Sequence, residues 1–140
     1  TTLLIPGDND RDEELNAMTA WVAEHLGPDV PMHFTAFHPD WKMRDIAATP
    51  PATLSRARRI AAENGIRYAY TGNVHDAEGG STWCHQCGEL LIERDWYRLG
   101  KWTLNAKGRC RHCDASIAGH FGGGPGQFGP KRIPVRLATP

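Results

Sequence analysis

The sequence contains no apolar run that approaches the roughly 20 residues of a transmembrane helix, so we expect no membrane span. It also lacks a recognisable signal peptide, because Thr1 opens directly into a strand-like run. Cysteine is scarce, with four residues in two close pairs, and without a secretory signal such pairs favour metal thiolates over disulfides. We therefore predict a cytoplasmic protein.

The chain has no net charge, so its average composition does not indicate a polyanionic partner. The distribution is less even, since residues 1–26 carry six acidic side chains against one basic, and residues 98–140 carry eight basic against one acidic. Such asymmetry is compatible with a nucleic-acid-facing end. A solvated surface with a basic tail is the interpretation we favour, so nucleic acid is a possible partner but not the expected one.

Strand-like and helix-like patterns alternate over the first 74 residues. Apolar runs predict strands at 1–7, 31–37 and 66–74, and apolar stripes at helical spacing predict helices at 11–26 and 50–64. The second helix follows Thr49, which we expect to be its N-cap. Alternating strands and helices predict an α/β fold with a parallel sheet and right-handed crossovers. Further strands or a complementary chain must then cover the sheet edges.

The character of the chain changes near residue 81, where aromatics, small turns and the cysteines replace the α/β pattern. We predict a β-α-β-α-β segment at 1–80, a small cysteine domain at 81–120 and a Gly/Pro-rich basic tail at 121–140. Within the tail, GGGPGQFG is not a phosphate-binding loop, because no strand precedes it and no helix follows it.

The four cysteines are spaced as two Cys-x2-Cys pairs that are separated by 22 residues. They are Cys84, Cys87, Cys110 and Cys113. Each pair is typical of a knuckle, a tight turn that directs two thiolates at one ion. Gly88 and Asp114 follow the pairs at matching places, where a knuckle needs a permissive backbone. The intervening residues predict a hairpin of 89–94 and 102–104, with Gly100 near its turn.

Four thiolates in a tetrahedral array suit zinc or a single rubredoxin-type iron, and we favour zinc. A zinc ion with four cysteines has no open position, so its role is structural, whereas iron would make the site an electron carrier. Because the sulfurs complete the shell, we expect His85 and His112, which lie inside the pairs, to face solvent.

Four aromatic residues cluster in sequence near this zinc-ribbon or rubredoxin-like domain: Trp83, Trp96, Tyr97 and Trp102. With the neighbouring arginines and lysines they are compatible with base stacking. We favour a structural role, in which they form the small core of the domain and seal it against the α/β part.

Several segments together resemble the C-terminal half of radical-SAM proteins related to pyruvate formate-lyase activating enzymes, and most closely the AmmeMemoRadiSam group. The segments are LLIPGDNDRDEEL, FTAFHPDWKM, TPPATLSRARRIAAENGIRYAYTGNV and the two cysteine pairs. The resemblance covers about residues 1–120. It implies that the three parallel strands and two helices are part of a partial (β/α)6 barrel, followed by a zinc ribbon.

The resemblance also implies S-adenosylmethionine (SAM) as a ligand, bound at the carboxyl ends of the strands, which agrees with the general rule for parallel sheets. By position, Pro6 and Gly7 would lie beside the adenine, and His38 would reach the ribose or methionine part. Asn73 ends the third strand and is a further candidate for the same site, whereas His33, in the middle of a strand, is expected to be a core or barrel-lining residue.

The chain departs from that family in lacking the Cys-x3-Cys-x2-Cys loop that holds a [4Fe–4S] cluster. We therefore expect it to be inactive alone and to be a fragment, one part of a split enzyme or a relic, with an unknown substrate and a missing N-terminal half as its partner. The alternatives are a non-catalytic zinc-ribbon module that binds nucleic acid or protein, and a rubredoxin-like electron carrier.

Overall fold

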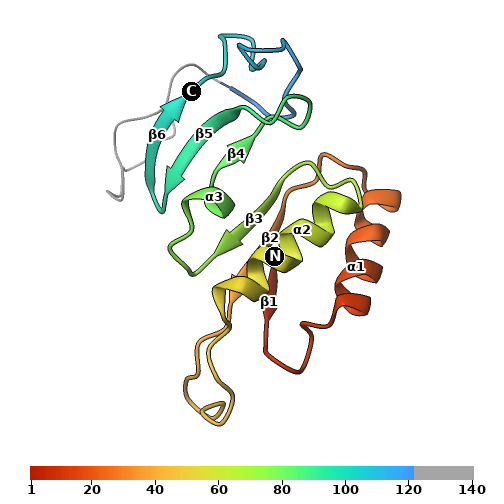
Figure 1. Ribbon diagram of the computed structural model, residues 1–140, viewed down its shortest axis with the longest axis vertical. Coiled ribbons are helices and arrows are strands. Elements are labelled where there is room, and N and C mark those ends of the chain that lie inside the picture. The colour runs from red at the N-terminus through yellow and green to blue at the C-terminus, as the bar shows by residue number, and fades with distance from the viewer. Residues whose placement is uncertain (122–140) are drawn as a thin grey trace, which may run out of the picture.

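The computed structural model of the protein describes residues 1–121, so the predicted tail lies outside the described residues apart from Phe121. The described residues form two three-stranded sheets and three helices (Figure 1). In chain order the elements are β1 (Thr2–Leu4), α1 (Asp12–His25), β2 (Met32–Ala36), α2 (Pro51–Glu63), β3 (Ala69–Gly72), α3 (Ala77–Gly80), β4 (Thr82–Trp83), β5 (Leu90–Asp95) and β6 (Arg98–Trp102).

The first sheet has the order β1-β2-β3, and both of its strand pairs are parallel, which confirms the predicted α/β class. The strands are shorter than predicted, because β1 ends before Pro6 and Gly7 turns the chain with a φ of +79°. The side chain of Asn9 then satisfies two backbone groups at this end of β1. Its Oδ1 accepts from Ile5 N at 2.8 Å, and its Nδ2 donates to Leu3 O at 3.0 Å.

Helices α1 and α2 lie side by side on one face of this sheet (Figure 1). The alternation of β2 explains the arrangement, since Met32, Phe34 and Ala36 are buried against the helices. The intervening His33 and Thr35 point to the opposite face, where β1 also exposes Leu3. Three strands do not close a barrel, so the (β/α)6 barrel stays a prediction.

Thr49 does not cap α2 as predicted, because the N-cap is Pro50, which makes no side-chain cap. Thr49 is instead buried between the carboxyl ends of β1 and β2. Its hydroxyl donates to Leu4 O at 2.6 Å and accepts from Phe37 N at 2.8 Å. The residue therefore joins two strands, a role for which the sequence carries no local signal.

The second sheet is antiparallel with the order β4-β5-β6. Its hairpin turns at Trp96 and Tyr97, where Trp96 has a φ of +53°, so the predicted turn near Gly100 is wrong. Gly100 lies within β6 and is covered by the side chain of Glu93, so a Cβ there would lie 2.3 Å from Glu93 Oε2. The adjacent N–H of Lys101 donates to the same carboxylate.

Tyr68 joins the two sheets. It precedes β3 in the chain, but its ring is buried in the core of the cysteine domain, beside Leu91 and Ile117. Its hydroxyl accepts a hydrogen bond from Ala118 N at 3.0 Å. The architecture changes between β3 and β4, and Tyr68 packs across that change.

Among residues 1–121, no helix combines the length and the apolar character that crossing a bilayer requires. The longest of them, α1, has 14 residues and carries three acidic side chains in its first turn.

Candidate metal centre

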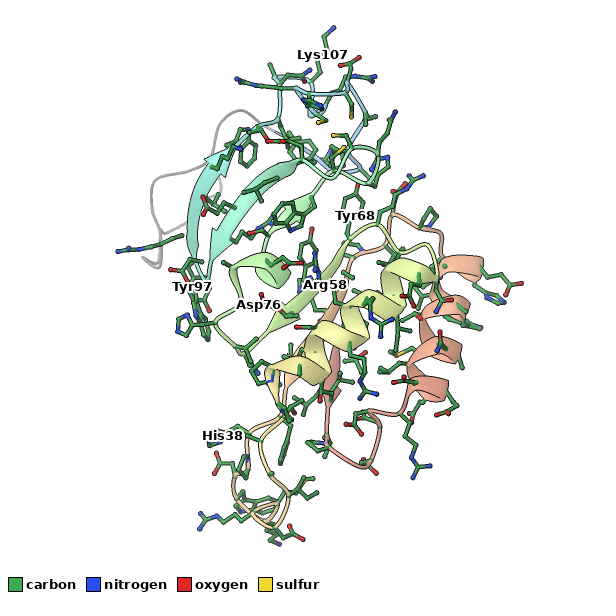
Figure 2. The ribbon with its side chains drawn as sticks, viewed as in Figure 1. His38, Arg58, Tyr68, Asp76, Tyr97 and Lys107 are labelled. Atoms are coloured by element: carbon green, nitrogen blue, oxygen red, sulfur yellow. The ribbon has the colours of Figure 1, made fainter. Side chains whose placement is uncertain are left out.

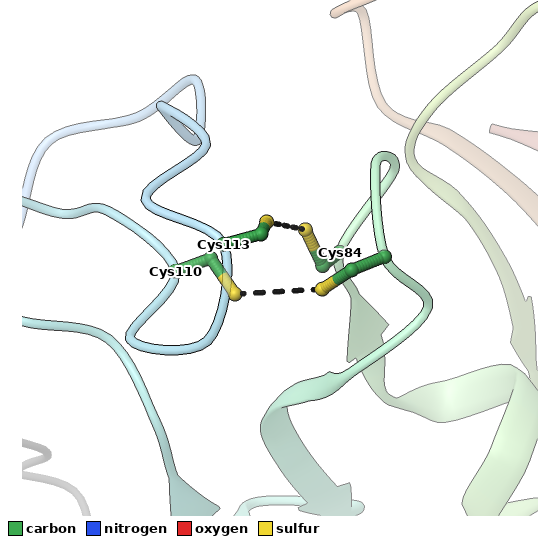
Figure 3. Close-up of side chains that lie close together, drawn as sticks. Cys84, Cys110 and Cys113 are labelled. Carbon is green, nitrogen blue, oxygen red and sulfur yellow. Dashed lines mark hydrogen bonds between the residues drawn. The ribbon is translucent and has the colours of Figure 1, made fainter.

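The predicted gathering of the four cysteines is confirmed, because their Sγ atoms all lie within 4.8 Å of one another. Two separations between the pairs are short: 3.6 Å from Cys84 to Cys113 and 3.7 Å from Cys87 to Cys110 (Figure 3). A tetrahedral zinc ion with Zn–S bonds of ~2.3 Å has S···S edges of about 3.8 Å, whereas a disulfide is ~2.0 Å long. The four sulfurs therefore fit one tetrahedral metal ion.

The two knuckles repeat one backbone pattern. In the first, Gly88 N donates to Cys84 O at 2.9 Å, and in the second, Asp114 N donates to Cys110 O at 2.9 Å. The donor residues both have left-handed backbones, with φ of +72° at Gly88 and +59° at Asp114, as the sequence predicted. This geometry is fixed by local turns, so the thiols are held in place by the backbone.

Two of the four cysteines are buried, and these two belong to the hydrophobic core of the domain. Cys84 and Cys110 pack there with Leu91, Leu104 and Ile117. Cys87 is exposed and Cys113 is half-buried, so one side of the sulfur cluster faces solvent. A bound ion would thus connect the core to its outer loops.

The sulfurs influence one another's ionisation. Burial acts to raise the pKa of Cys84, but N–H groups of Cys87 and Gln86 and the neighbouring thiols donate to its sulfur, so the pKa falls to about 7. At Cys87 the Glu89 N–H acts to lower the pKa, yet the partial loss of hydration and the other three thiols raise it to about 12. One sulfur therefore ionises near neutral pH and opposes ionisation of the next, a repulsion that a divalent cation would remove.

The two histidines inside the knuckles are not ligands in this arrangement. His85 and His112 are both exposed, as predicted, and neither belongs to the four-residue metal cluster. The donor set among the described residues is therefore four sulfurs, with no open coordination position for a substrate.

The candidates for a SAM site lie elsewhere. His38 follows β2 in an exposed loop at the opposite end of the molecule from Lys107, which lies next to the second knuckle (Figure 2). Asn73 follows β3 with a φ of +59°, and its Nδ2 donates to Ala36 O at 3.2 Å, so it joins the carboxyl ends of β2 and β3. Pro6 and Gly7 occupy the turn after β1.

These four candidates thus share the carboxyl-end edge of the parallel sheet without forming one contact cluster. Sequence reasoning also missed Arg94, which together with Asn73 lines a cavity between the sheets. The sequence shows only a charged residue in a strand, which gives no sign of that position.

The four expected aromatic core residues divide into two groups. Trp83 and Trp102 are half-buried, and Trp102 packs against the core of the cysteine domain. Trp96 and Tyr97 are 53% and 70% exposed at the hairpin tip, so the expectation that they seal the core is wrong for these two. The turn position explains the difference, because residues at a two-residue turn project beyond both strands.

Comparisons with known proteins give one informative match. No protein-family model matches the chain, and no solved structure matches it. The chain is similar to an uncharacterized protein of Methanocaldococcus jannaschii, with 41% identity over 118 residues. These residues make up 84% of this chain but 35% of the archaeal protein, so the chain spans about a third of the length of this relative.

Proposed function

We propose that this chain is the C-terminal portion of a radical-SAM activating-enzyme-like protein. In this proposal the four cysteines hold a structural zinc ion, and the carboxyl-end edge of the first sheet forms part of the wall of the SAM site. The complete protein would cleave SAM reductively to a 5′-deoxyadenosyl radical, which abstracts hydrogen from a substrate. The cluster that supplies the electron would belong to the missing part, since this chain lacks its cysteine motif.

The one-sided sheet carries the proposal. Both helices cover one face, whereas His33 and Leu3 are exposed on the other. In a barrel of alternating strands and helices, the helices lie outside and the other strand face points to the interior. An incomplete barrel wall would therefore have the arrangement seen here, and the much greater length of the archaeal relative supplies the size of chain that completion would need.

The position of the edge residues supports a ligand at that edge. Parallel sheets bind ligands beyond the carboxyl ends of their strands. Thr49 and Asn73 brace those ends by hydrogen bonds to Leu4, Phe37 and Ala36, which gives a ligand a rigid floor. His38 leaves the same edge with its side chain exposed, where it is free to reach a cofactor.

The closed donor set and its location support a structural role for zinc. The knuckles lie at the end of the molecule opposite His38, so an ion there is remote from the proposed SAM edge (Figure 2). Element analysis of protein purified without added metal tests this part of the proposal. One zinc per chain supports a scaffold, whereas one iron per chain would make the electron-carrier alternative the better one.

A titration of SAM into the longest natural protein that contains this chain tests whether SAM is the ligand. We expect SAM to bind and His38→Ala to weaken the affinity, while His85→Ala, in the distant first knuckle, leaves it unchanged. Absence of SAM binding by the longer protein would refute the assignment. Absence of binding by the isolated chain is expected, because most of the site would be missing.

The exposed hairpin tip favours a second candidate function, a module that binds nucleic acid. Tyr97 is 70% exposed, and the exposed Arg98 follows it, a pairing of aromatic and cationic groups that suits base stacking. This function requires an affinity for single-stranded RNA or DNA that falls steeply with salt and is lost in Tyr97→Ala. Absence of binding at low salt would remove it.

A further inference from the structure

A cavity of about 690 Å³ separates the open face of the first sheet from the hairpin of the second. His33, Tyr70 and Asn73 line it from β2, β3 and the residue after β3, and Arg94 and Trp96 line it from the hairpin. This volume lies within the range of small-molecule sites, ~300–1,000 Å³. Because both sheets contribute walls, a ligand there would contact the α/β part and the cysteine domain together.

Arg94 is the fixed positive charge of this cavity. Its guanidinium lies over the ring of Tyr70, 5.6 Å from the centroid, and donates one hydrogen bond to Thr82 Oγ1. Within residues 1–121 no carboxylate lies within ion-pair distance of it. A guanidinium carries five N–H donors in a planar fork, so donors remain for a ligand, and that fork matches a carboxylate in shape and charge.

A pair of aromatic rings forms part of the cavity wall. The imidazole of His33 lies 5.0 Å from the ring of Tyr70, centroid to centroid. Burial and the charge of Arg94 lower the pKa of His33, which favours the uncharged ring and adds to the flat surface of the cavity.

Two carboxylates also border the cavity, those of Asp76 and Asp95. Asp76 accepts hydrogen bonds at both oxygens, from Thr71 Oγ1 and from Gly79 N, each at 2.9 Å. Asp95 is exposed and lies 3.7 Å from His75 Nδ1. Neither carboxylate forms an ion pair with Arg94, so the guanidinium keeps its charge available to an anion from solution.

We propose that this cavity binds a small planar carboxylate, whose anionic end pairs with Arg94 while its flat body packs against Tyr70 and His33. The cavity adjoins Asn73 at the sheet edge assigned above to SAM, which places the carboxylate where a substrate of the proposed enzyme would bind. That identification as a substrate rests on the proposed function. The binding of the carboxylate does not depend on the proposed function, because every residue involved belongs to the described chain.

An NMR titration of the metal-loaded chain with benzoate, and separately with the neutral isostere benzamide, tests the proposal. We expect benzoate to shift the Tyr70 and Trp96 ring resonances with a Kd on the order of 1 mM. Benzamide should bind about tenfold more weakly, since it lacks the charge-assisted pair. Arg94→Gln should remove this preference, Arg94→Lys should retain part of it, and Arg98→Gln, at the exposed tip, should keep it.

Equal affinity for benzoate and benzamide, or benzoate-induced shifts confined to other surfaces, would overturn the inference, as would no binding at about ten times the expected Kd. Unchanged amide spectra of the Arg94 variants establish that they fold. The SAM titration reports on a different ligand and a longer protein. Absence of SAM binding there would refute the proposed function without affecting the benzoate result. Absence of benzoate binding would overturn this inference without affecting the SAM result.

Discussion

Removal of the metal ion is expected to unfold the cysteine domain while the α/β part remains folded. The domain has a core of eight buried residues, and two of them, Cys84 and Cys110, belong to the four-cysteine cluster. So small a unit buries too little apolar surface to fold securely without a metal or disulfides. Structural zinc contributes ~10–16 kcal/mol in comparable small sites, which is similar in size to the ~5–15 kcal/mol stability of a whole domain.

Hydrogen exchange measured by mass spectrometry, with and without a chelator, tests this expectation. Loss of even 4 kcal/mol lowers amide protection by a factor of about 10³, since each 1.4 kcal/mol is tenfold. We expect that loss in peptides from residues 81–120. Peptides from β2 and α2 should keep their protection, because the first core packs around Phe34 and Leu54 without a cysteine.

Matched variants distinguish the effect of losing the metal ion from the effect of changing a residue near it. Cys113→Ser should reproduce the effect of the chelator, whereas His112→Ala, one residue away and exposed, should leave protection and metal content unchanged. Unchanged exchange of residues 81–120 after complete metal removal would refute the reasoning. So would equal loss of protection in β2, because the two cores would then unfold as one.

Three further predictions concern single contacts. Gly88→Ala should weaken metal binding about tenfold in a chelator competition, because a left-handed backbone costs a non-glycine residue ~1–2 kcal/mol and the space around Gly88 is otherwise empty. Thr49→Val should lower the free energy of unfolding in urea by ~1–3 kcal/mol, since the buried hydroxyl satisfies two backbone groups; no change would mean that water replaces it. Tyr68→Phe should cost ~0.5–1.5 kcal/mol by removing the acceptor of the Ala118 N–H, with faster exchange at Ala118 as its signature.

The four-cysteine cluster is expected to influence the cavity between the two sheets. The sulfur cluster joins the loops of the second sheet. Tyr68, just before β3, packs in the hydrophobic core that contains Cys84 and Cys110. The hairpin of the same sheet presents Arg94 to the open face. Metal loss is therefore expected to reduce benzoate binding as well, although the metal lies outside the cavity.

The sequence by itself determined the features that depend on local spacing. The Cys-x2-Cys pairs predicted two knuckles, and Gly88 and Asp114 marked the left-handed residues, because these turns are formed within a few residues. The α/β alternation was equally readable, since apolar periodicity reports which face of each element is buried.

Only the tertiary structure decided the contacts between distant segments. The positions of Thr49 and Tyr68 depend on partners more than 40 residues away, in β1 and after the second knuckle, and no local pattern encodes such partners. The hairpin turn likewise falls at Trp96 and Tyr97, so the glycine that resembled a turn residue lies within a strand, where the side chain of Glu93 covers it. The cavity beside Arg94 arises only when the two sheets pack, because each sheet supplies one wall.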